Sequence, residues 1–282
     1  MVSARSPMQQ LSTIGRPVDF RYKTNKAIAL ITLAVILVAA AIRIASGGAI
    51  LDDLFWGLKA ELAVFLTWAL GRELDPDHDL SAFVAVIFSV VALGLFGLPS
   101  VGLLFWLLLI SRTVNRTTGA PASVLDSCIT LALAVWLSKA FGVAILYLTA
   151  GSFFLDAWIG PKSQRQFLVA GLAVIAAVGA VLLRWAGSYG AQNANACLIA
   201  LAFTACFTPI FIEGSKVECL DDKSIARLQP LRVQSAQVMA LLSGILLALL
   251  LGVSGLKLLS PLWAIAIGAP IYWVAGLGKW RT

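Results

Sequence analysis

Long apolar runs recur through this 282-residue chain and constrain its fold more than any other feature. Residues 27–41 and 241–251 are almost continuously apolar, and 60% of the chain is hydrophobic while only 12% is charged. Within a bilayer the backbone must satisfy its own hydrogen bonds, so only helices and closed barrels can span it. Barrel strands alternate polar and apolar residues, and these runs do not alternate. The pattern therefore predicts an all-α, polytopic integral membrane protein.

The number of spans follows from the length of the apolar segments, because a membrane-spanning helix needs about 20 apolar residues, or fewer where other helices shield it. Ten segments qualify: 27–46, 54–71, 81–97, 100–111, 122–138, 140–158, 167–184, 195–212, 236–258 and 262–277. The segment 100–111 is too short to cross unaided, and 122–158 could be divided differently, so we expect eight to ten transmembrane helices. They would form one domain, 27–282, after a basic tail at 1–26, with polar loops at 72–80, 111–121, 159–166 and 213–235.

The basic residues predict how the helices are oriented. If the N-terminus is cytoplasmic, sixteen of the 21 Lys and Arg residues fall at cytoplasmic ends or loops. Such an excess sets membrane orientation and here favours an even number of spans, with both termini in the cytoplasm. The net charge of +7 is explained in this way, and no aromatic-basic interleaving points to a nucleic acid partner. We expect a protein of the cytoplasmic (inner) membrane of a bacterium, with membrane lipid as its partner.

The densest group of charges lies between two apolar segments, in residues 67–79. Its D-x-D-x-D run consists of Asp75, Asp77 and Asp79. Mg²⁺ takes one or two protein carboxylates and completes its shell with water and substrate phosphate. The run therefore predicts a metal site with these three aspartates as ligands and Mg²⁺ as the cofactor. The alternative is an acidic helix-start loop, because carboxylates stabilise the positive end of the next helix; His78 is then a solvated loop residue.

A second polar stretch, 111–121, carries Arg112 and Arg116 among hydroxyl residues and a glycine. Guanidinium groups bind phosphate oxygens in a bidentate manner, so this stretch predicts a phosphate cradle. The alternative is an ordinary loop in which both arginines mark topology and anchor lipid headgroups. Asp126 lies one turn into the next segment, deeper than the headgroups, and needs a partner. Arg112 and Arg116 are the nearest basic residues in sequence.

Two further features have both a functional and a structural interpretation. The mixed-charge loop 213–232 is a solvated surface loop, a lid, or a second acidic half that faces Asp75–Asp79. Glu61 lies in the middle of the second segment, where a charged residue costs about 2.5–3.5 kcal/mol on insertion scales and is a candidate functional group. Its alternative is that 50–60 lies along the membrane interface, which would keep Asp52, Asp53 and Lys59 in water.

These features predict an enzyme that works at the cytoplasmic face on a phosphorylated lipid or isoprenoid. Its catalytic residues would be Asp75, Asp77, Arg112, Arg116 and Asp126, and its apolar bundle would hold the lipid tail. The layout is similar to that of intramembrane transferases of prenyl groups. However, their carboxylates lie four residues apart and these lie two apart, so no family is assigned. The alternatives are a secondary transporter with a midplane site at Glu61, and a non-catalytic subunit of a membrane complex.

Overall fold

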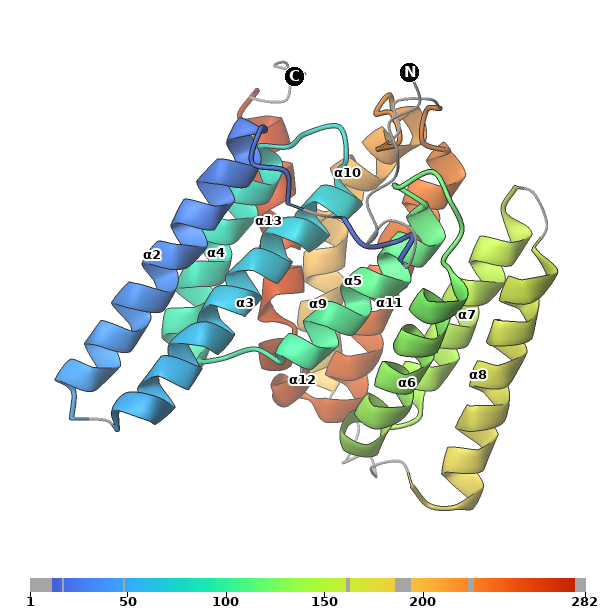
Figure 1. Ribbon diagram of the computed structural model, residues 1–282, viewed down its shortest axis with the longest axis horizontal. Coiled ribbons are helices and arrows are strands. Elements are labelled where there is room, and N and C mark those ends of the chain that lie inside the picture. The colour runs from blue at the N-terminus through green and yellow to red at the C-terminus, as the bar shows by residue number, and fades with distance from the viewer. Residues whose placement is uncertain are drawn as a thin grey trace.

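The structure is a computed structural model that describes residues 12–16, 18–47, 49–160, 163–185, 194–222 and 226–276. Within these ranges its regular elements are helices, apart from one isolated antiparallel bridge between Leu220 and Arg227. The prediction of an all-α fold is confirmed. The helices are α2 (Lys23–Ala45), α3 (Ile50–Leu74), α4 (Ser81–Phe96), α5 (Val101–Asn115), α6 (Val124–Phe141), α7 (Ala144–Trp158), α8 (Gln164–Leu182), α9 (Ala194–Cys206), α10 (Thr208–Glu213), the 3₁₀ turn η1 (Gly214–Lys216), α11 (Pro230–Leu251), α12 (Val253–Leu258) and α13 (Ser260–Val274) (Figure 1).

Five of the described helices are long and apolar enough to cross a membrane, namely α2, α3, α6, α8 and α11. A sixth is added if α9 and the α10–η1 segment, which meet at an angle of 47°, count as one bent span. The helices α4, α5, α7 and α13 are apolar but shorter. By length and composition these helices indicate a membrane-embedded protein, as the sequence predicts.

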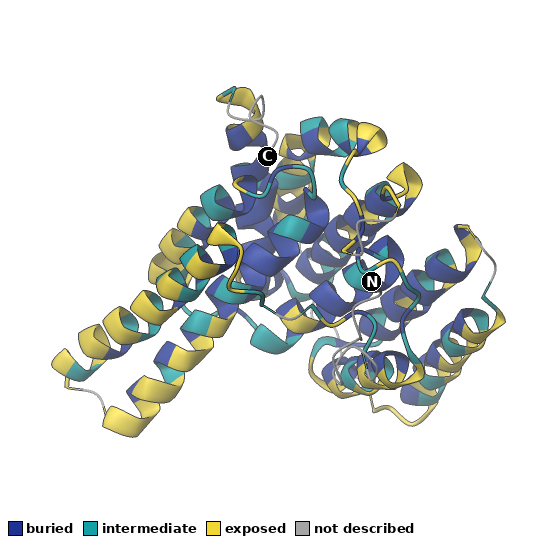
Figure 2. Ribbon diagram, turned by 45° about the horizontal axis from the view of Figure 1, so that its top comes forward, coloured by how far each residue is buried: buried dark blue, intermediate teal, exposed yellow. Residues whose placement is uncertain are grey.

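The outer helices carry apolar side chains on their exposed faces. Leu30, Leu33 and Leu37 are exposed on α2, as are Leu168 and Ile175 on α8. Figure 2 shows these exposed faces on the two flanks of the bundle. Monomers that live in water seldom expose apolar patches of this extent, whereas lipid covers them at no cost.

The centre of the bundle is the short helix α5, of which eleven residues out of fifteen are buried. Its Trp106 is fully buried and donates from Nε1 to Thr149 Oγ1 on α7 at 2.9 Å. A short helix tolerates membrane depth when other helices surround it, and α5 continues past the expected end at 111 to Asn115. The most extensive packing joins α13 to α4. The two helices approach closely at Gly268, where a Cβ atom would lie 2.7 Å from the backbone nitrogen of Ala85.

One predicted segment is divided in the structure. Residues 236–258 were expected to form a single helix, but α11 ends at Leu251 and α12 begins after Gly252, whose φ is +63°. Glycine adopts this left-handed conformation readily, so the chain turns here. Gly255 then packs against α11, and a Cβ atom there would collide with the carbonyl oxygen of Leu247.

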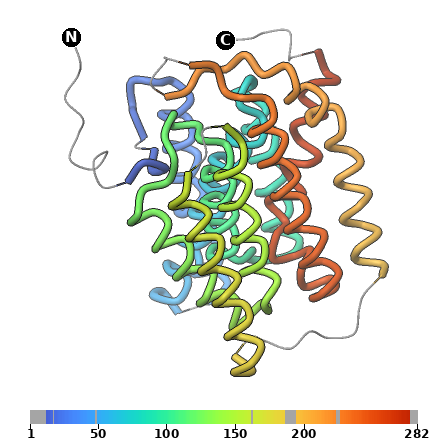
Figure 3. The backbone as a smooth tube through the Cα atoms, turned by 90° about the vertical axis from the view of Figure 1, so that its right-hand side faces the viewer, coloured from blue at the N-terminus to red at the C-terminus, as the bar shows by residue number. Residues whose placement is uncertain are grey.

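The helices run up and down along one common direction, as two perpendicular views show (Figures 1 and 3). Consequently α3, α5 and α7 end where α4, α6 and α11 begin, which is the upper end in Figure 1. The start of α2 and the end of α13 lie at this end too. We call it the polar end, and define it by the loops 75–80, 116–123 and 217–222. It holds both sequence stretches that were proposed to carry chemistry.

Candidate functional site

Glu73, in the last turn of α3, is the centre of a buried group of charges at the polar end. Its Oε1 accepts hydrogen bonds from Arg112 Nε at 3.0 Å and from Arg16 Nη1 at 3.3 Å. Arg16 also forms an ion pair with Asp222, whose pKa is raised above its ordinary value by burial despite the nearby guanidinium. Asn115 Nδ2 donates to the carbonyl oxygen of Glu73 at 2.7 Å. A buried carboxylate needs such partners, and here they tie the ends of α3 and α5 together.

Asp156, in α7, is the centre of a second group. It is fully buried, and its Oδ1 accepts from Arg116 Nε at 2.5 Å and from Arg232 Nη1 at 2.9 Å. Arg232 also donates to the carbonyl oxygens of Val114 and Ile159. Arg116 has a φ of +52° and forms the left-handed cap of α5. Both predicted phosphate-binding arginines therefore form ion pairs with buried carboxylates, Arg112 with Glu73 and Arg116 with Asp156.

Asp126 has other partners than the expected ones. It forms a capping box with Ser123 at the start of α6. It also accepts from Ser12 Oγ at 2.6 Å and from the backbone nitrogen of Thr13 at 2.8 Å. The prediction that Arg112 or Arg116 pairs with it is wrong, because the segment 12–16 folds back onto the polar end. Within that segment Ile14 is 2% exposed and packs in a small apolar cluster.

Each carboxylate of the D-x-D-x-D run has a different partner. Asp75 Oδ1 lies 2.9 Å from His78 Nδ1, and Asp79 pairs with Arg72 at 2.8 Å. Asp77 Oδ1 accepts from the backbone nitrogen of Cys219 at 2.8 Å. Among the described residues no three His, Cys, Asp or Glu side chains are grouped so that they could hold a metal. The expectation for His78 is wrong: it is 4% exposed, and its ring lies 6.0 Å from that of Tyr272.

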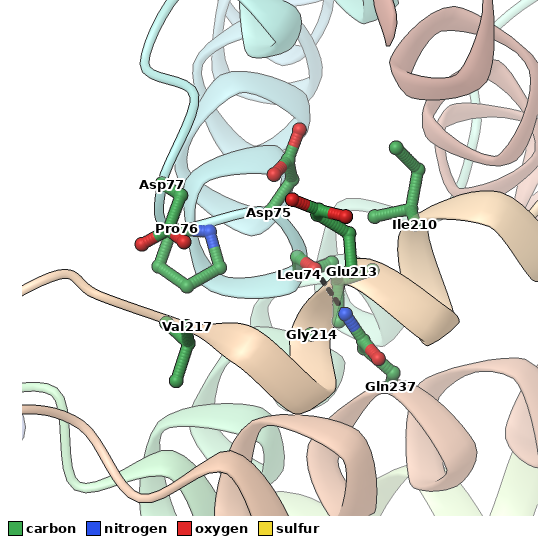
Figure 4. Close-up of a pocket in the computed structure, with 9 residues that line it drawn as sticks. All are labelled: Leu74, Asp75, Pro76, Asp77, Ile210, Glu213, Gly214, Val217 and Gln237. Atoms are coloured by element: carbon green, nitrogen blue, oxygen red, sulfur yellow. Dashed lines mark hydrogen bonds between the residues drawn. The ribbon is translucent and has the colours of Figure 1, made fainter. Parts of the chain in front are cut away.

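A pocket opens at the polar end between the end of α3 and the α10–η1 segment (Figure 4). It contains about 200 Å³ of empty space, a figure that includes open solvent. Its enclosed part is far smaller than the roughly 300–1,000 Å³ of a drug-sized ligand site. The lining residues are Leu74, Asp75, Pro76, Asp77, Ile210, Glu213, Gly214, Val217 and Gln237. Three of these are acidic, and no basic residue of the described chain is among them.

The pocket brings together two of the predicted site residues, Asp75 and Asp77, with Glu213 from the loop that was interpreted as a second acidic half. Asp79, Arg112, Arg116 and Asp126 are not part of its lining. Two sets of hydrogen bonds hold the loop 217–222 in place. The Asp77 carboxylate accepts from the backbone nitrogens of residues 218 and 219. The backbone nitrogen of Asp222 donates to the carbonyl oxygen of Thr117 at 2.9 Å.

Glu61 lies apart from this pocket. It is half-buried on α3, near the exposed Lys59. The alternative that keeps residues 50–60 in water is wrong for Asp53, which is 1% exposed and accepts from Arg43 Nε at 2.7 Å. Asp52 and Lys59 are exposed.

Sequence reasoning did not pair Arg16 with Glu73 or Asp156 with Arg116 and Arg232, and it did not single out Gln237. A signal was present for Asp156, because a carboxylate at the end of an apolar segment must be paired when it is buried. None was present for Arg16, whose partner Glu73 is 57 residues away. The fold and the site together define a helical protein with several helices apolar and long enough to span a membrane, with buried ion pairs and with an acidic pocket at one end. No family model, curated protein or solved structure matches the chain.

Proposed function

We propose that this protein is an integral membrane enzyme that acts at its polar end on a phosphorylated lipid or isoprenoid, with Mg²⁺ as cofactor. One observation carries the proposal. The acidic end of α3, the arginine-bearing end of α5 and the loop 217–222 meet at one end of the bundle, where the end of α3 and Val217 line an acidic pocket. Bound Mg²⁺ would neutralise phosphate charge there, while the apolar bundle would accommodate the tail.

The residues of the polar end take different roles in this proposal. Asp75 and Asp77 line the pocket and are the groups nearest to a bound headgroup. Arg112 and Arg116 position the end of α5 through Glu73 and Asp156, which their Nε atoms contact at 3.0 and 2.5 Å. A guanidinium has five N–H donors, so further N–H groups of both arginines would bind the phosphate. Asp126 fixes the segment 12–16 beside them.

We also propose ten spans, with the polar end and both termini in the cytoplasm of a bacterium. Eight of the ten predicted segments each correspond to one described helix, 195–212 corresponds to the bent pair, and 236–258 comprises α11 and α12; consecutive segments run in opposite directions. The test is labelling of a variant whose sole cysteine is introduced by Ser215→Cys, at an exposed position of η1 at the polar end. A membrane-impermeant thiol reagent should label it in inverted inner-membrane vesicles and not in intact cells. Labelling in intact cells would reverse the orientation.

Turnover is tested on the purified chain in nanodiscs, with a panel of isoprenyl phosphates, isoprenyl diphosphates and phosphatidic acid, and with products identified by mass spectrometry. Asp75→Asn and Asp77→Asn should each lower turnover at least about 100-fold, since removal of one key polar group in a catalytic site costs about 10²–10³. Asp52→Asn, an exposed aspartate at the opposite end of α3, is the matched control. Unchanged turnover in both pocket variants, or no turnover of any substrate, overturns the proposal. Transport through Glu61 and a subunit role remain predictions.

A further inference from the structure

We infer that this protein forms a parallel homodimer in the membrane through the first half of α3, with Lys59 of each copy paired to Glu61 of the other. The inference requires that α3 crosses the membrane, for which it is long and apolar enough. It stands apart from the proposed enzymatic activity, because the acidic pocket lies at the other end of α3.

The first observation is a pair of ionisable residues inside the apolar helix α3. Lys59 is exposed and Glu61 is half-buried. Neither has an ion pair or a side-chain hydrogen bond among the described residues. At a rise of about 1.5 Å per residue, both lie at least about 13 Å along the helix from either of its ends. Charged residues at such depth are costly, and they are almost always paired or turned toward protein.

The helix itself does not supply these partners. Side chains three or four residues apart meet on the surface of a helix. At these spacings both residues have only apolar neighbours or glycine, namely Phe55, Trp56, Leu62 and Ala63 for Lys59, and Gly57, Leu58, Val64 and Phe65 for Glu61. On α2, which packs along this half of α3, Arg43 is already paired with Asp53 at 2.7 Å. The counter-charges therefore come from a second molecule.

The second observation is the pattern of the exposed face between the two charges. Four apolar residues recur there at intervals of four, three and four positions, and all are exposed: Leu51, Phe55, Leu58 and Leu62. This is the a/d spacing of two helices that pack in parallel along a seam. In the same register Lys59 takes position e and Glu61 takes position g, so the two charges flank the seam on opposite sides.

This seam is left open by the rest of the chain. The helix α2 covers a different face of α3, at Gly57, where an added Cβ atom would lie 3.0 Å from the carbonyl oxygen of Ile36. Figure 2 shows the hairpin of α2 and α3 projecting from the bundle, with exposed residues along both helices. A second molecule can therefore reach the seam without displacing any described helix.

A second copy is the partner that this face fits, because the face is complementary to itself. Two copies inserted in the same orientation have parallel α3 helices. A two-fold axis along the membrane normal then brings the e edge of one helix to the g edge of the other. Lys59 and Glu61 differ in height by only about 3 Å along the helix, so two equivalent ion pairs form at nearly the same depth. One symmetry operation thus satisfies all four charges.

Cross-linking in native membranes tests the seam. The native cysteines are replaced by serine, and Leu58→Cys is introduced at a d position. A parallel two-fold pair brings position 58 of both copies together, so mild oxidation should give a disulfide-linked dimer. Leu172→Cys, at an exposed apolar position of α8, is the matched control and should stay monomeric. Absence of the dimer with Leu58→Cys, or equal cross-linking at both positions, overturns the inference.

Exchange of the two charges tests the ion pairs. Sedimentation equilibrium of the full-length chain in a density-matched detergent gives the dissociation constant of the dimer. Lys59→Glu and Glu61→Lys should each weaken dimerisation at least about tenfold, because like charges then face each other across the seam. The double variant Lys59→Glu/Glu61→Lys should regain the affinity of the unchanged chain, which a folding defect would not allow. Lys257→Glu, at an exposed lysine of α12, should leave the affinity unchanged.

Size-exclusion chromatography verifies that each variant is folded. If a charge variant does not fold, the Leu58→Cys cross-link decides, because it leaves both charges in place. A monomeric unchanged chain overturns the inference and leaves Lys59 and Glu61 to lipid headgroups or to a different membrane protein. Dimers of equal affinity in both single variants, or a folded double variant that stays monomeric, overturn the pairing of Lys59 with Glu61.

Discussion

Gln237, on α11, donates from Nε2 to the carbonyl oxygen of Leu74, the last residue of α3, at 2.7 Å. The last carbonyls of a helix have no partner within it, and Asn115 serves that of Glu73 in the same way. Two buried amide side chains from α11 and α5 thus fix the end of α3. Asp75 follows directly, so its direction into the pocket depends on three helices rather than on a flexible loop.

Asp156→Asn should destabilise the protein strongly. Its carboxylate lies between Arg116 and Arg232, and the side chain of Arg232 is only 4% exposed. Removing one partner of a buried ion pair costs about 3–5 kcal/mol because the remaining charge has no counter-ion. Thermal unfolding in detergent, followed by circular dichroism, measures the loss. The exposed Asp52→Asn should change stability by less than about 0.5 kcal/mol; equal melting temperatures for the two variants would contradict the prediction.

Asp126→Ala should release the segment 12–16 while the bundle stays folded. The variant loses the bonds from Ser12, Thr13 and Ile14 to the carboxylate. A loss of about 1–3 kcal/mol would raise the population of the open segment about 5- to 160-fold. Thermolysin cleaves before apolar residues such as Ile14, and its rate follows that population when opening is fast. Cleavage at the rate of the unchanged chain would show that Asp126 does not hold the segment.

The segments of the fold could be predicted because hydropathy is a local signal, and the ten apolar stretches coincide with described helices, although 195–212 is a bent pair and 236–258 comprises α11 and α12. The residues at which the helices end could be predicted less well. The boundary at Gly252 depends on a backbone angle, and the continuation of α5 to Asn115 depends on Asn115 finding a buried partner in α3.

The site was predictable only in part, because its pairings are long-range. The acidic run 75–79 was visible in the sequence, and the pocket includes two of its members. What could not be seen is that Arg72, His78 and the amides of the loop would each take one carboxylate. Proximity in sequence suggested Arg112 and Arg116 as partners of Asp126. In the structure, the guanidinium groups instead pair with Glu73 and Asp156 on neighbouring helices.

Gly268→Ala should destabilise the packing of α13 on α4. A Cβ atom at this position would lie 2.7 Å from the backbone nitrogen of Ala85, and backbone cannot move aside as a side chain can. Overpacking of this kind costs about 1–3 kcal/mol. Gly171, in α8, has nothing within 4 Å of its added Cβ, so Gly171→Ala should be neutral or stabilise by up to about 1 kcal/mol. Chemical unfolding in mixed micelles compares the two, and similar midpoints would contradict the close approach.

Cys219 should react slowly with thiol reagents at neutral pH. Burial raises the pKa of its thiol from 9.0 to about 11, the carboxylates of Asp77 and Asp79 add to the effect, and Arg16 and Arg72 oppose it. A raised pKa leaves less thiolate at a given pH, and the thiolate is the reactive form. At pH 8 we therefore expect about one thiolate per thousand chains rather than about one in ten.

The measurement uses iodoacetamide and a variant in which Cys128, Cys197 and Cys206 are replaced by serine. The rate should rise about tenfold for each pH unit from 8 to 10, without a plateau in that interval, because the thiolate fraction grows tenfold per unit below the pKa. Asp77→Asn in the same background removes one of the nearby negative charges and should move the profile toward lower pH. A rate that levels off between pH 9 and 10 would mean that the thiol lies in water, and that the loop 217–222 does not pack against Asp77 as it does in this structure.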